Sequence, residues 1–290
     1  MEKQEFKEIK LEDKTLFDKY FEKYPGEISE FSFVNLFSWR KFRKHKFCEF
    51  ENHLVIASFS GDLKIYEPVG ENSAEIMQKL AKMFPEAHFE RVSEKTAQVM
   101  KEKEYSIYEQ RDTDDYVYST EDMRELKGRK YEHKRTFINQ YEKNNPRTEL
   151  LSENNIGKCM ELQKKWFSEK GENEKNEILH AENEAILETL ENFRGLDLIG
   201  ACIFIGEEIQ GFAIGEKLNN STVVEHTEKA DTKYKGAYQY LLREFAKSVP
   251  DKYIYINREQ DLGIQGLRKA KMGYLPVKMI KQFRIEYKKN

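Results

Sequence analysis

The residues best suited to chemistry lie in the stretch Glu225-His226-Thr227-Glu228-Lys229-Ala230. Glu228 falls where a predicted strand ends, and a carboxylate there can hold an α-amino group or act as a general base toward an acceptor. The alternative is a structural ion pair of Glu228 with Lys229 or Arg258. His226 shares the predicted strand face of Glu228, so it is placed either to shuttle a proton or simply to be hydrogen-bonded.

A loop and a helix start follow this strand. Unpaired N–H groups and the positive end of the helix dipole can hold an anion there. Gly236 would let the backbone approach a ligand closely, with Ala237 opening the helix, and Lys233 and Lys235 would add positive charge. The alternative is an ordinary helix start with solvated lysines.

The next predicted strand ends in a second group of polar residues. Asn257, Arg258 and Asp261 lie at its end and in the following loop, where ligands gather in open α/β sheets. Arg258 can clamp a carboxylate or phosphate with its planar fork, whereas Asp261 can cap the helix that starts directly after it. Lys271 lies on that helix, where it either approaches a substrate phosphate or is a solvated charge.

A basic segment precedes these residues. Between Arg124 and Arg135 six basic residues face two acidic ones. Phosphate contacts from Lys and Arg supply most sequence-independent affinity for RNA, and Tyr131 or His133 could stack on a base. The alternative is a solvated linker. The RNA-binding candidates are Lys127, Arg129, Lys130, Lys134 and Arg135.

The elements that must position these residues occur in the same order twice. Apolar periodicity predicts two helices, a three-stranded meander, and then helix, strand, helix and strand. The first set is predicted at 11–24, 32–40, 47–66, 73–83, 87–90, 93–103 and 105–108. The second is predicted at 153–168, 176–192, 196–228, 236–248, 253–257, 264–272 and 277–287. The sequence therefore predicts two copies of one fold.

The fold class is α/β (α+β), with two tandem lobes that each have a mixed, mainly antiparallel sheet flanked by helices. We expect an N-terminal lobe at 1–111, a basic connecting segment at 112–146 and a C-terminal lobe with the ligand site at 147–290. Val69-Gly70-Glu71 is the first lobe's nearest equivalent of the anion loop and lacks its pattern. We therefore expect that only the second lobe kept its pocket.

Composition narrows the function classes. The 290 residues are 39% hydrophobic, enough for a sizeable core, and the net charge of -3 lacks the broad positive field of a nucleic-acid coat protein. Three distant cysteines predict reduced, buried thiols and no metal site. The N-terminus has no apolar targeting segment and no stretch is long enough to span a membrane, so we expect a cytoplasmic protein. Motifs of hydrolases, metalloproteases, NTPases and dehydrogenases do not occur.

The element order resembles that of the GNAT acyltransferases. Tyr253-Ile254-Tyr255-Ile256-Asn257 resembles their fifth strand, and Leu267 to Tyr274 resembles their helix ending in Gly-aromatic. Their coenzyme A loop reads (Arg/Gln)-x-x-Gly-x-(Gly/Ala), whereas this chain has Lys233-x-x-Gly236-x-Tyr238, with a bulky residue where a small one belongs.

A closer resemblance covers nearly the whole chain. Its strings are Asp115-Tyr116-Val117-Tyr118, residues 126–135, Glu228-Lys229-Ala230, residues 234–238 and residues 257–276. Together they resemble the DUF2156 family, which is similar to the C-terminal domain of bacterial phosphatidylglycerol lysyltransferases. The resemblance implies a tandem GNAT fold and kinship with Fem-type enzymes, which move an aminoacyl group from tRNA.

We therefore expect an acyl or aminoacyl transferase with aminoacyl-tRNA as donor and tRNA as partner. The acceptor, a small molecule, peptide or lipid, stays open. Aminoacyl esters are already activated, so catalysis would be mostly positioning with no covalent nucleophile. The alternatives are an N-acetyltransferase that uses coenzyme A or acyl-CoA, and a non-catalytic protein of the GNAT fold that binds a small ligand or RNA.

Overall fold

The computed structural model describes residues 5–100, 104–171 and 176–288, and it divides into two compact units. The first unit comprises Met1–Asp115, Gln260–Arg268 and Met279–Asn290, and the second comprises Tyr116–Glu259 and Lys269–Lys278. Each unit has a mixed sheet flanked by helices, so the predicted fold class is confirmed. No helix within the described residues is long and apolar enough to cross a membrane.

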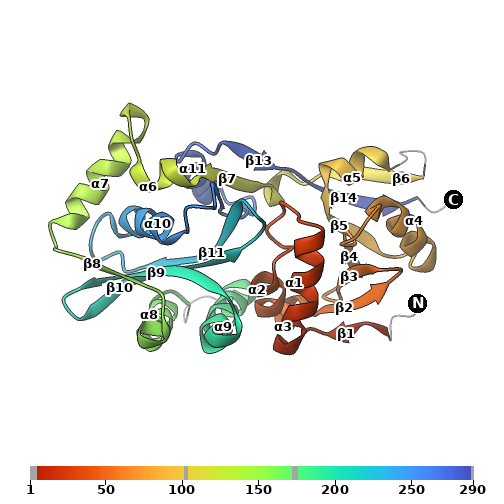
Figure 1. Cartoon of the computed structure of the whole chain (residues 1–290), viewed down its shortest axis with the longest axis horizontal. Helices are drawn as coiled ribbons and strands as arrows, with labels where there is room; N and C mark the ends of the chain where they lie inside the picture. The colour runs from red at the N-terminus through yellow and green to blue at the C-terminus, as the bar shows by residue number, and fades with distance from the viewer. Residues whose placement is uncertain (1–4, 101–103, 172–175, 289–290) are drawn as a thin grey trace. The chain divides into compact units, whose positions relative to one another are not determined.

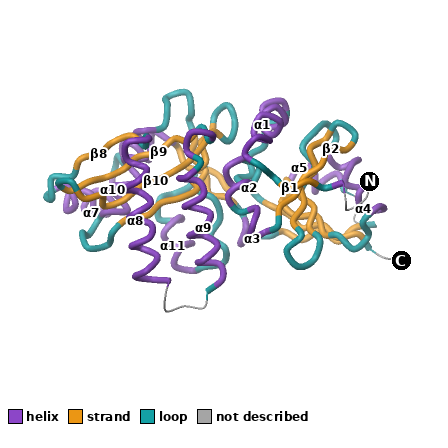
Figure 2. The backbone as a smooth tube through the Cα atoms, turned by 90° about the horizontal axis from the view of Figure 1, so that it is seen from below, coloured by secondary structure: helices purple, strands orange, loops and turns teal. Residues whose placement is uncertain are grey.

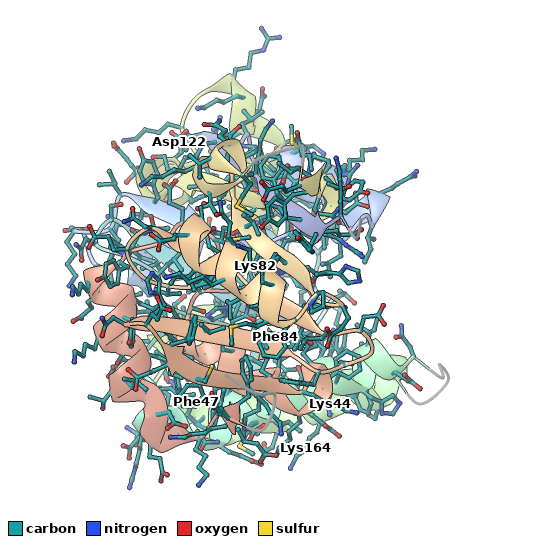
Figure 3. All side chains as sticks on the ribbon, turned by 90° about the vertical axis from the view of Figure 1, so that its right-hand side faces the viewer. Lys44, Phe47, Lys82, Phe84, Asp122 and Lys164 are labelled. Carbon is teal, nitrogen blue, oxygen red and sulfur yellow. The ribbon has the colours of Figure 1, made fainter. Side chains whose placement is uncertain are left out.

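The first unit is built on a seven-stranded sheet of order β1-β2-β3-β4-β5-β14-β6 (Figure 1). Its strands are β1 (Lys7–Glu8), β2 (His45–Phe50), β3 (His53–Ser58), β4 (Lys64–Tyr66), β5 (His88–Ser93), β6 (Tyr105–Glu109) and β14 (Gln282–Tyr287). Its helices are α1 (Lys14–Lys23), α2 (Phe33–Ser38), α3 (Arg40–Arg43), α4 (Ser73–Met83) and α5 (Glu94–Val99). Among the described strands of this sheet, only β4 and β5 pair in parallel. Figure 3 looks onto α4, whose end is marked by Lys82 and Phe84.

The core of this unit lies between α4 and the sheet. Apolar residues recur along α4 at helical spacing, so Ile76, Met77, Leu80 and Ala81 are all buried against strand residues such as Phe89. Helix α5 is shorter than the predicted helix 93–103, because Met100 already has extended backbone angles. Residues 101–103 of that prediction lie outside the described residues.

The second unit is built on a sheet of order β13-β7-β12-β11-β10-β9-β8. Its strands are β7 (Asp115–Ser119), β8 (Arg147–Leu150), β9 (Leu198–Ile205), β10 (Glu208–Lys217), β11 (Thr222–Ala230), β12 (Tyr255–Asn257) and β13 (Lys278–Ile280). Its helices are α6 (Thr120–Glu125), α7 (Glu132–Glu142), α8 (Glu153–Gly171), α9 (Glu177–Glu191), α10 (Ala237–Ser248) and α11 (Gln265–Met272), the last beginning in the first unit. Helix α10 covers one face of the sheet, and α8 and α9 lie side by side on the other (Figure 2).

The last strand differs from the sequence-based prediction. Residues 277–287 are predicted as one strand completing the second lobe, but they form β13 in the second sheet and β14 in the first. Strand β14 lies between β5 and β6, and Ile285 is fully buried in the first core. Alternating apolar residues show that a strand has a buried face, but not which sheet it joins.

Candidate functional site

The site of the second unit forms where two neighbouring strands part. Strand β11 pairs in parallel with β12 only from Thr222↔Tyr255 to Val224↔Asn257, yet it continues to Ala230. Among the described residues, the remaining part of β11 therefore has no strand partner on the β12 side. Such a parting at the carboxyl end of a parallel pair is where open α/β sheets bind ligands.

A β-bulge reshapes β11 at this point. Ile214 of β10 pairs with Thr227 and Gly215 pairs with Glu225, so His226 is the extra residue. A bulge interrupts the two-residue alternation of side chains. The prediction that His226 and Glu228 share a face is not reflected in their contacts, because Glu225 and not His226 shares a partner with Glu228.

That partner is Arg258, which follows β12 directly. Its Nε donates to Glu225 and its Nη2 donates to Glu228 at 2.5 Å. These two nitrogens form one edge of the guanidinium, so the two carboxylates are neighbours. The side chains of Glu225, Arg258 and Glu228 are only 3%, 11% and 16% exposed, so all three groups are largely out of water. The structural alternative for Glu228, a pair with Arg258, is thus present.

Glu228 has an altered acidity. Burial is the main cause that raises the pKa of its carboxyl and the charge of Glu225 adds to the rise, whereas Arg258 and Lys271 oppose it, and the resulting pKa is about 8. Its Oε1 atom is buried and has no hydrogen-bond partner, and the same is true of Oε1 of Glu225. A carboxyl whose pKa lies near neutrality can both accept and return a proton.

His226 belongs to a second buried pair of contacts. Its Nδ1 lies 2.7 Å from Glu259 and its Nε2 lies 3.0 Å from Glu216. Burial lowers the pKa of His226, but the hydrogen bonds to Glu216 and Glu259 outweigh this and raise it to about 10. The ring is therefore an imidazolium that donates to two carboxylates, a structural cation more than a proton shuttle.

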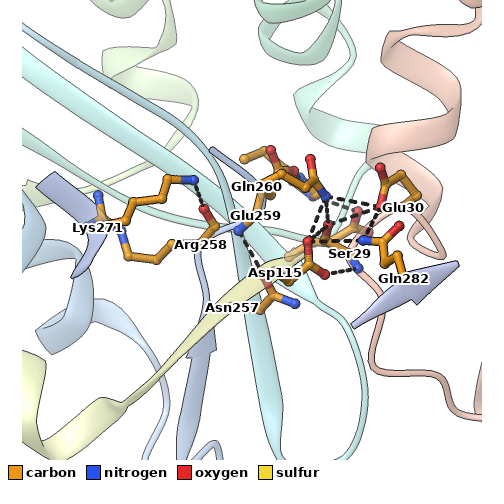
Figure 4. Close-up of polar contacts among 11 residues, drawn as sticks. Ser29, Glu30, Asp115, Asn257, Arg258, Glu259, Gln260, Lys271 and Gln282 are labelled. Carbon is orange, nitrogen blue, oxygen red and sulfur yellow. Dashed lines mark hydrogen bonds and ion pairs between the residues drawn. The ribbon is translucent and has the colours of Figure 1, made fainter. Parts of the chain in front are cut away.

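Lys271 and Asn257 complete the surroundings. Figure 4 shows Lys271 reaching the backbone carbonyl of Arg258, and Asn257 accepting a hydrogen bond from the backbone of Glu259 at 2.8 Å. Tyr118 donates its hydroxyl to the carbonyl of Lys271 at 2.8 Å. Lys271 is buried, so its reading as a solvated helix charge is wrong. These contacts fix the turn from which Arg258 extends.

The described partners of Lys229 are other residues than those that hold Glu228. Its ammonium lies 3.0 Å from Glu182 and 3.8 Å from the centre of the Trp166 ring. Residues 228 and 229 point to different partners, as consecutive residues of a strand do. The alternative pairing of Glu228 with Lys229 does not occur among the described contacts.

The loop before α10 has a structural explanation. Gly236 has φ +96°, and a Cβ at this position would lie 2.1 Å from the carbonyl oxygen of Phe137, so glycine is required by packing against α7. Lys233 and Lys235 are exposed, and Ala237 is buried at the helix start. Tyr238, which replaces the expected small residue, is held in contact with the backbone of Ala230. The loop thus has the character of an ordinary helix start with solvated lysines.

The basic segment divides into structural and exposed residues. Arg135 donates to the carbonyls of Leu126 and Gly128, and Lys134 lies 3.9 Å from the centre of the Tyr274 ring. Burial lowers the pKa of Lys134, and the charge of Arg258 lowers it further. The exposed cations are Lys127, Arg129 and Lys130, and Lys130 pairs with Asp122 at 2.9 Å.

Asp261 belongs to the first unit. Its Oδ1 accepts from the backbone of Gly263 at 2.8 Å, and Arg268 binds both of its oxygens at 2.8 Å. Helix α11 begins only at Gln265, so Asp261 stabilises the turn before the helix.

The first unit also contains a cleft, contrary to the expectation that only the second lobe kept a pocket. It has a volume of about 920 Å³ and lies where β4 and β5 part, beside Val69 and Gly70. Glu67 lines this cleft and accepts hydrogen bonds from the backbone of Ser93 and the hydroxyl of Thr96. Glu228 does not line the described cavities.

The described residues contain no group of three His, Cys, Asp or Glu side chains placed to hold a metal ion. All three cysteines are buried thiols outside disulfides, as predicted. Sequence reasoning assigned no role to Glu216, Glu225 or Glu259. The sequence carries little sign of their roles. Glu225 reaches Arg258 because of a bulge in β11, and Glu259 reaches His226 because its backbone has a positive φ.

Comparison with known proteins identifies the family to which the chain belongs. The family model described as "Phosphatidylglycerol lysyltransferase, C-terminal" matches residues 21–286. A protein of unknown function from Bacteroides thetaiotaomicron is 30% identical, with a TM-score of 0.91 over 98% of this chain and 99% of that one. L-PGS from Bacillus licheniformis is 14% identical, with a TM-score of 0.68 over 95% of this chain and 92% of that one.

FemX shares the fold at 9% identity, with a TM-score of 0.57 over 98% of this chain and 97% of that one. These likenesses confirm tandem GNAT-like lobes. The chain spans 55% of the length of a curated relative, an uncharacterised protein of Mycoplasmoides gallisepticum that is 24% identical over 175 residues.

Proposed function

Because the chain belongs to the family of the phosphatidylglycerol lysyltransferase C-terminal domain, we propose that it is an aminoacyl transferase that takes its donor from tRNA. The observation that supports this most directly is the Glu228 carboxyl, held by Arg258 where β11 leaves its parallel partner. The second unit, with the described site, would carry the reaction. The fold that the chain shares with L-PGS and FemX supports this proposal.

The chemistry needs no group beyond the described side chains and the two substrates. An aminoacyl ester is already activated, so the protein has to place its carbonyl carbon beside the acceptor and remove a proton from the acceptor. Glu228 is the general base in this proposal, since its pKa of about 8 suits proton exchange near neutrality. Arg258 is a positioning residue that holds Glu225 and Glu228 together.

The loop before α10, which was the main argument for coenzyme A binding, has another explanation. Gly236 is explained by packing against Phe137, and Tyr238 occupies the place of the expected small residue. We therefore favour tRNA as the partner, with the exposed cations Lys127, Arg129 and Lys130 as its phosphate contacts. We leave Arg135 out of this set, because its guanidinium donates to the carbonyls of Leu126 and Gly128 and so stabilises the loop that carries the other three.

A transfer assay tests the reaction. The protein is incubated with tRNA charged with labelled amino acids and with a cell extract as the source of acceptors. We expect tRNA-dependent movement of label to a non-tRNA product, reduced about 100-fold in Glu228→Gln, as for loss of a general base. An unchanged rate in Glu228→Gln, or no transfer with any charged tRNA, would contradict the proposal.

Filter binding across a salt series tests the partner. The variant Lys127→Ala, Arg129→Ala, Lys130→Ala should bind tRNA more weakly, with a salt slope lower by about one for each phosphate that the protein no longer neutralises. The control Lys82→Ala, Lys95→Ala, Lys143→Ala removes three exposed charges elsewhere and should bind as the parent does. No binding at low salt would exclude tRNA.

A further inference from the structure

The end of α11 and the segment that leads from it to β13 expose apolar side chains. Met272, Leu275 and Val277 are 46%, 45% and 51% exposed, although their residue types usually lie inside a protein. Apolar residues scattered singly over a surface are ordinary, whereas three within six residues concentrate apolar surface on one short segment. We call these three side chains the apolar patch, and all of them belong to the second unit.

The backbone that carries the apolar patch is held in place. Tyr274, between two of the exposed residues, is buried, and its carbonyl accepts a hydrogen bond from the hydroxyl of Tyr131 at 3.1 Å. The N–H of Val277 donates to the carbonyl of Val117 at 2.8 Å, where the chain enters the edge strand β13. The exposure of the patch is therefore a fixed feature of the fold.

Leu275 is unfavourable at its position in two ways. Its φ of +56° lies in the left-handed region, which a leucine rarely adopts, and its side chain is apolar and exposed. A glycine or an asparagine would relieve the backbone and expose less apolar surface. Because neither the backbone nor the core of the free chain benefits from this leucine, a contact outside the chain explains it best.

The neighbourhood of the patch is positively charged. Residues 262–278 contain four basic side chains and no acidic one, although Arg268 among them is paired with two aspartates of the first unit. Lys269 is exposed in the last turn of α11. Lys134 lies 3.9 Å from the centre of the ring of Tyr274. The described contacts pair neither of these two lysines with a carboxylate, so the surface is cationic as well as apolar.

This combination distinguishes among the partners that could cover the patch. A second copy of the chain, related by a two-fold axis, would place the same lysines against each other. RNA would satisfy the lysines, but its phosphate backbone offers no apolar surface to the three aliphatic side chains. An anionic lipid bilayer offers both, because negative headgroups lie directly above apolar acyl chains.

We propose that the apolar patch inserts into the surface of an anionic lipid membrane, with Lys269 and Lys134 at the level of the headgroups. The stem of a lysine can run along apolar surface while its ammonium group stays with the headgroups. The inference goes beyond the proposed function. It concerns where the chain docks, and it is independent of which molecule receives the aminoacyl group.

Co-sedimentation with lipid vesicles tests the docking. Vesicles of phosphatidylcholine with about one quarter phosphatidylserine supply the negative surface, and pure phosphatidylcholine is the neutral comparison. We expect the parent to bind the anionic vesicles at least about tenfold more tightly, with a difference that shrinks as salt is added. The variant Met272→Ser, Leu275→Ser, Val277→Ser should bind them at least about tenfold more weakly than the parent. Lys269→Ala should weaken binding about fivefold.

Leu150→Ser, Ile178→Ser is the matched control. The two side chains are 67% and 60% exposed, and Leu150 lies on β8, at the opposite edge of the same sheet from β13. This variant should bind vesicles as the parent does. Circular dichroism verifies that each variant is folded. The triple serine variant should still bind tRNA as the parent does in filter binding, because its substitutions leave the exposed cations in place.

Four outcomes would overturn the proposal. The first is absence of vesicle binding by the parent at low salt. The second is equal binding by the parent and the triple serine variant, which would show that the adhesion is electrostatic alone. The third is a parent that sediments as a dimer and a serine variant that sediments as a monomer, which would assign the patch to a second copy of the chain. The fourth is loss of tRNA binding by the folded serine variant, which would assign the patch to RNA.

Discussion

Glu228 couples the stability of the folded chain to pH. Its pKa is about 8 when folded against an ordinary value of 4.5, because burial favours the neutral form. The raised value contributes stability that is complete below pH 4.5 and is lost as the pH rises through 8. Glu228→Gln cannot ionise. We predict that between pH 5 and pH 9 the parent loses about 4 kcal/mol of unfolding free energy relative to Glu228→Gln.

Urea unfolding of both proteins at pH 5, 7 and 9 measures this difference. Glu142→Gln, which changes an exposed carboxylate, should keep a constant difference from the parent across the same range. If Glu228→Gln also runs parallel to the parent, Glu228 is not held neutral by burial.

His226 should stabilise the fold through its charge. Its pKa of about 10 lies above its ordinary value of 6.5, so this contribution is complete below pH 6.5 and disappears as the pH rises through 10. His226→Gln leaves Glu216 and Glu259 without their common cation. We predict a loss of about 3 kcal/mol at pH 6 that shrinks by pH 10. Chemical denaturation measures it, and Glu216→Gln added to His226→Gln should restore part of the loss.

The polar residues of the site were predictable by type and place but not by partnership. A strand end followed by a loop predicts the positions of Glu228 and Arg258, and one alternative already named them as a pair. Strand alternation then assigns His226 to the face of Glu228. The extra residue at the bulge changes which side chains share a face with Glu228. The alternation of apolar and polar residues in the sequence does not predict where a bulge occurs. Glu225 therefore emerges only from the structure.

At the scale of elements, Gly236 is required by the conformation and packing of the backbone, independently of any ligand. Its φ of +96° and its approach to Phe137 exclude a side chain whatever the loop binds. We predict that Gly236→Ala lowers the unfolding free energy by about 2 kcal/mol or more. Gly266, on α11, has open space around it, and Gly266→Ala should be neutral or stabilising by up to about 1 kcal/mol. Thermal unfolding compares the two variants, and equal effects would contradict the packing account.

The order of elements was largely predictable because apolar periodicity depends on local burial. Helix α4 and the meander β9 to β11 occur where the pattern places them. The assignment of strands to sheets was not predictable, since β7 and β14 are segments of five and six residues whose apolar pattern fits either sheet. Pairings between residues far apart in the sequence decide it, such as Phe283 of β14 against Val92 of β5.

At the scale of the molecule, the first unit depends on the last strand. Ile285 is fully buried in the first core, and β14 lies inside that sheet. We predict that Ile285→Asp unfolds the first unit or lowers its stability by at least about 3 kcal/mol, because it buries an unpaired charge. Ile254→Asp, at a side chain 56% exposed, should have little effect. Hydrogen exchange of β2 and β3 amides reports the outcome, and retained protection in Ile285→Asp would contradict it.

The chain leaves the first unit at Asp115 and returns at Gln260, and these two residues meet. Gln260 donates to Asp115 at 2.6 Å, Ser29 donates to both oxygens of Asp115, and all three are buried (Figure 4). During synthesis on the ribosome, the first unit therefore stays incomplete until the whole stretch from Tyr116 to Glu259 has been made. Gln260 and the strand between β5 and β6 are made only with the segments that begin at Gln260 and Met279. A nascent chain or a truncated gene product lacks a finished first sheet, and no continuous fragment of the gene encodes that unit alone.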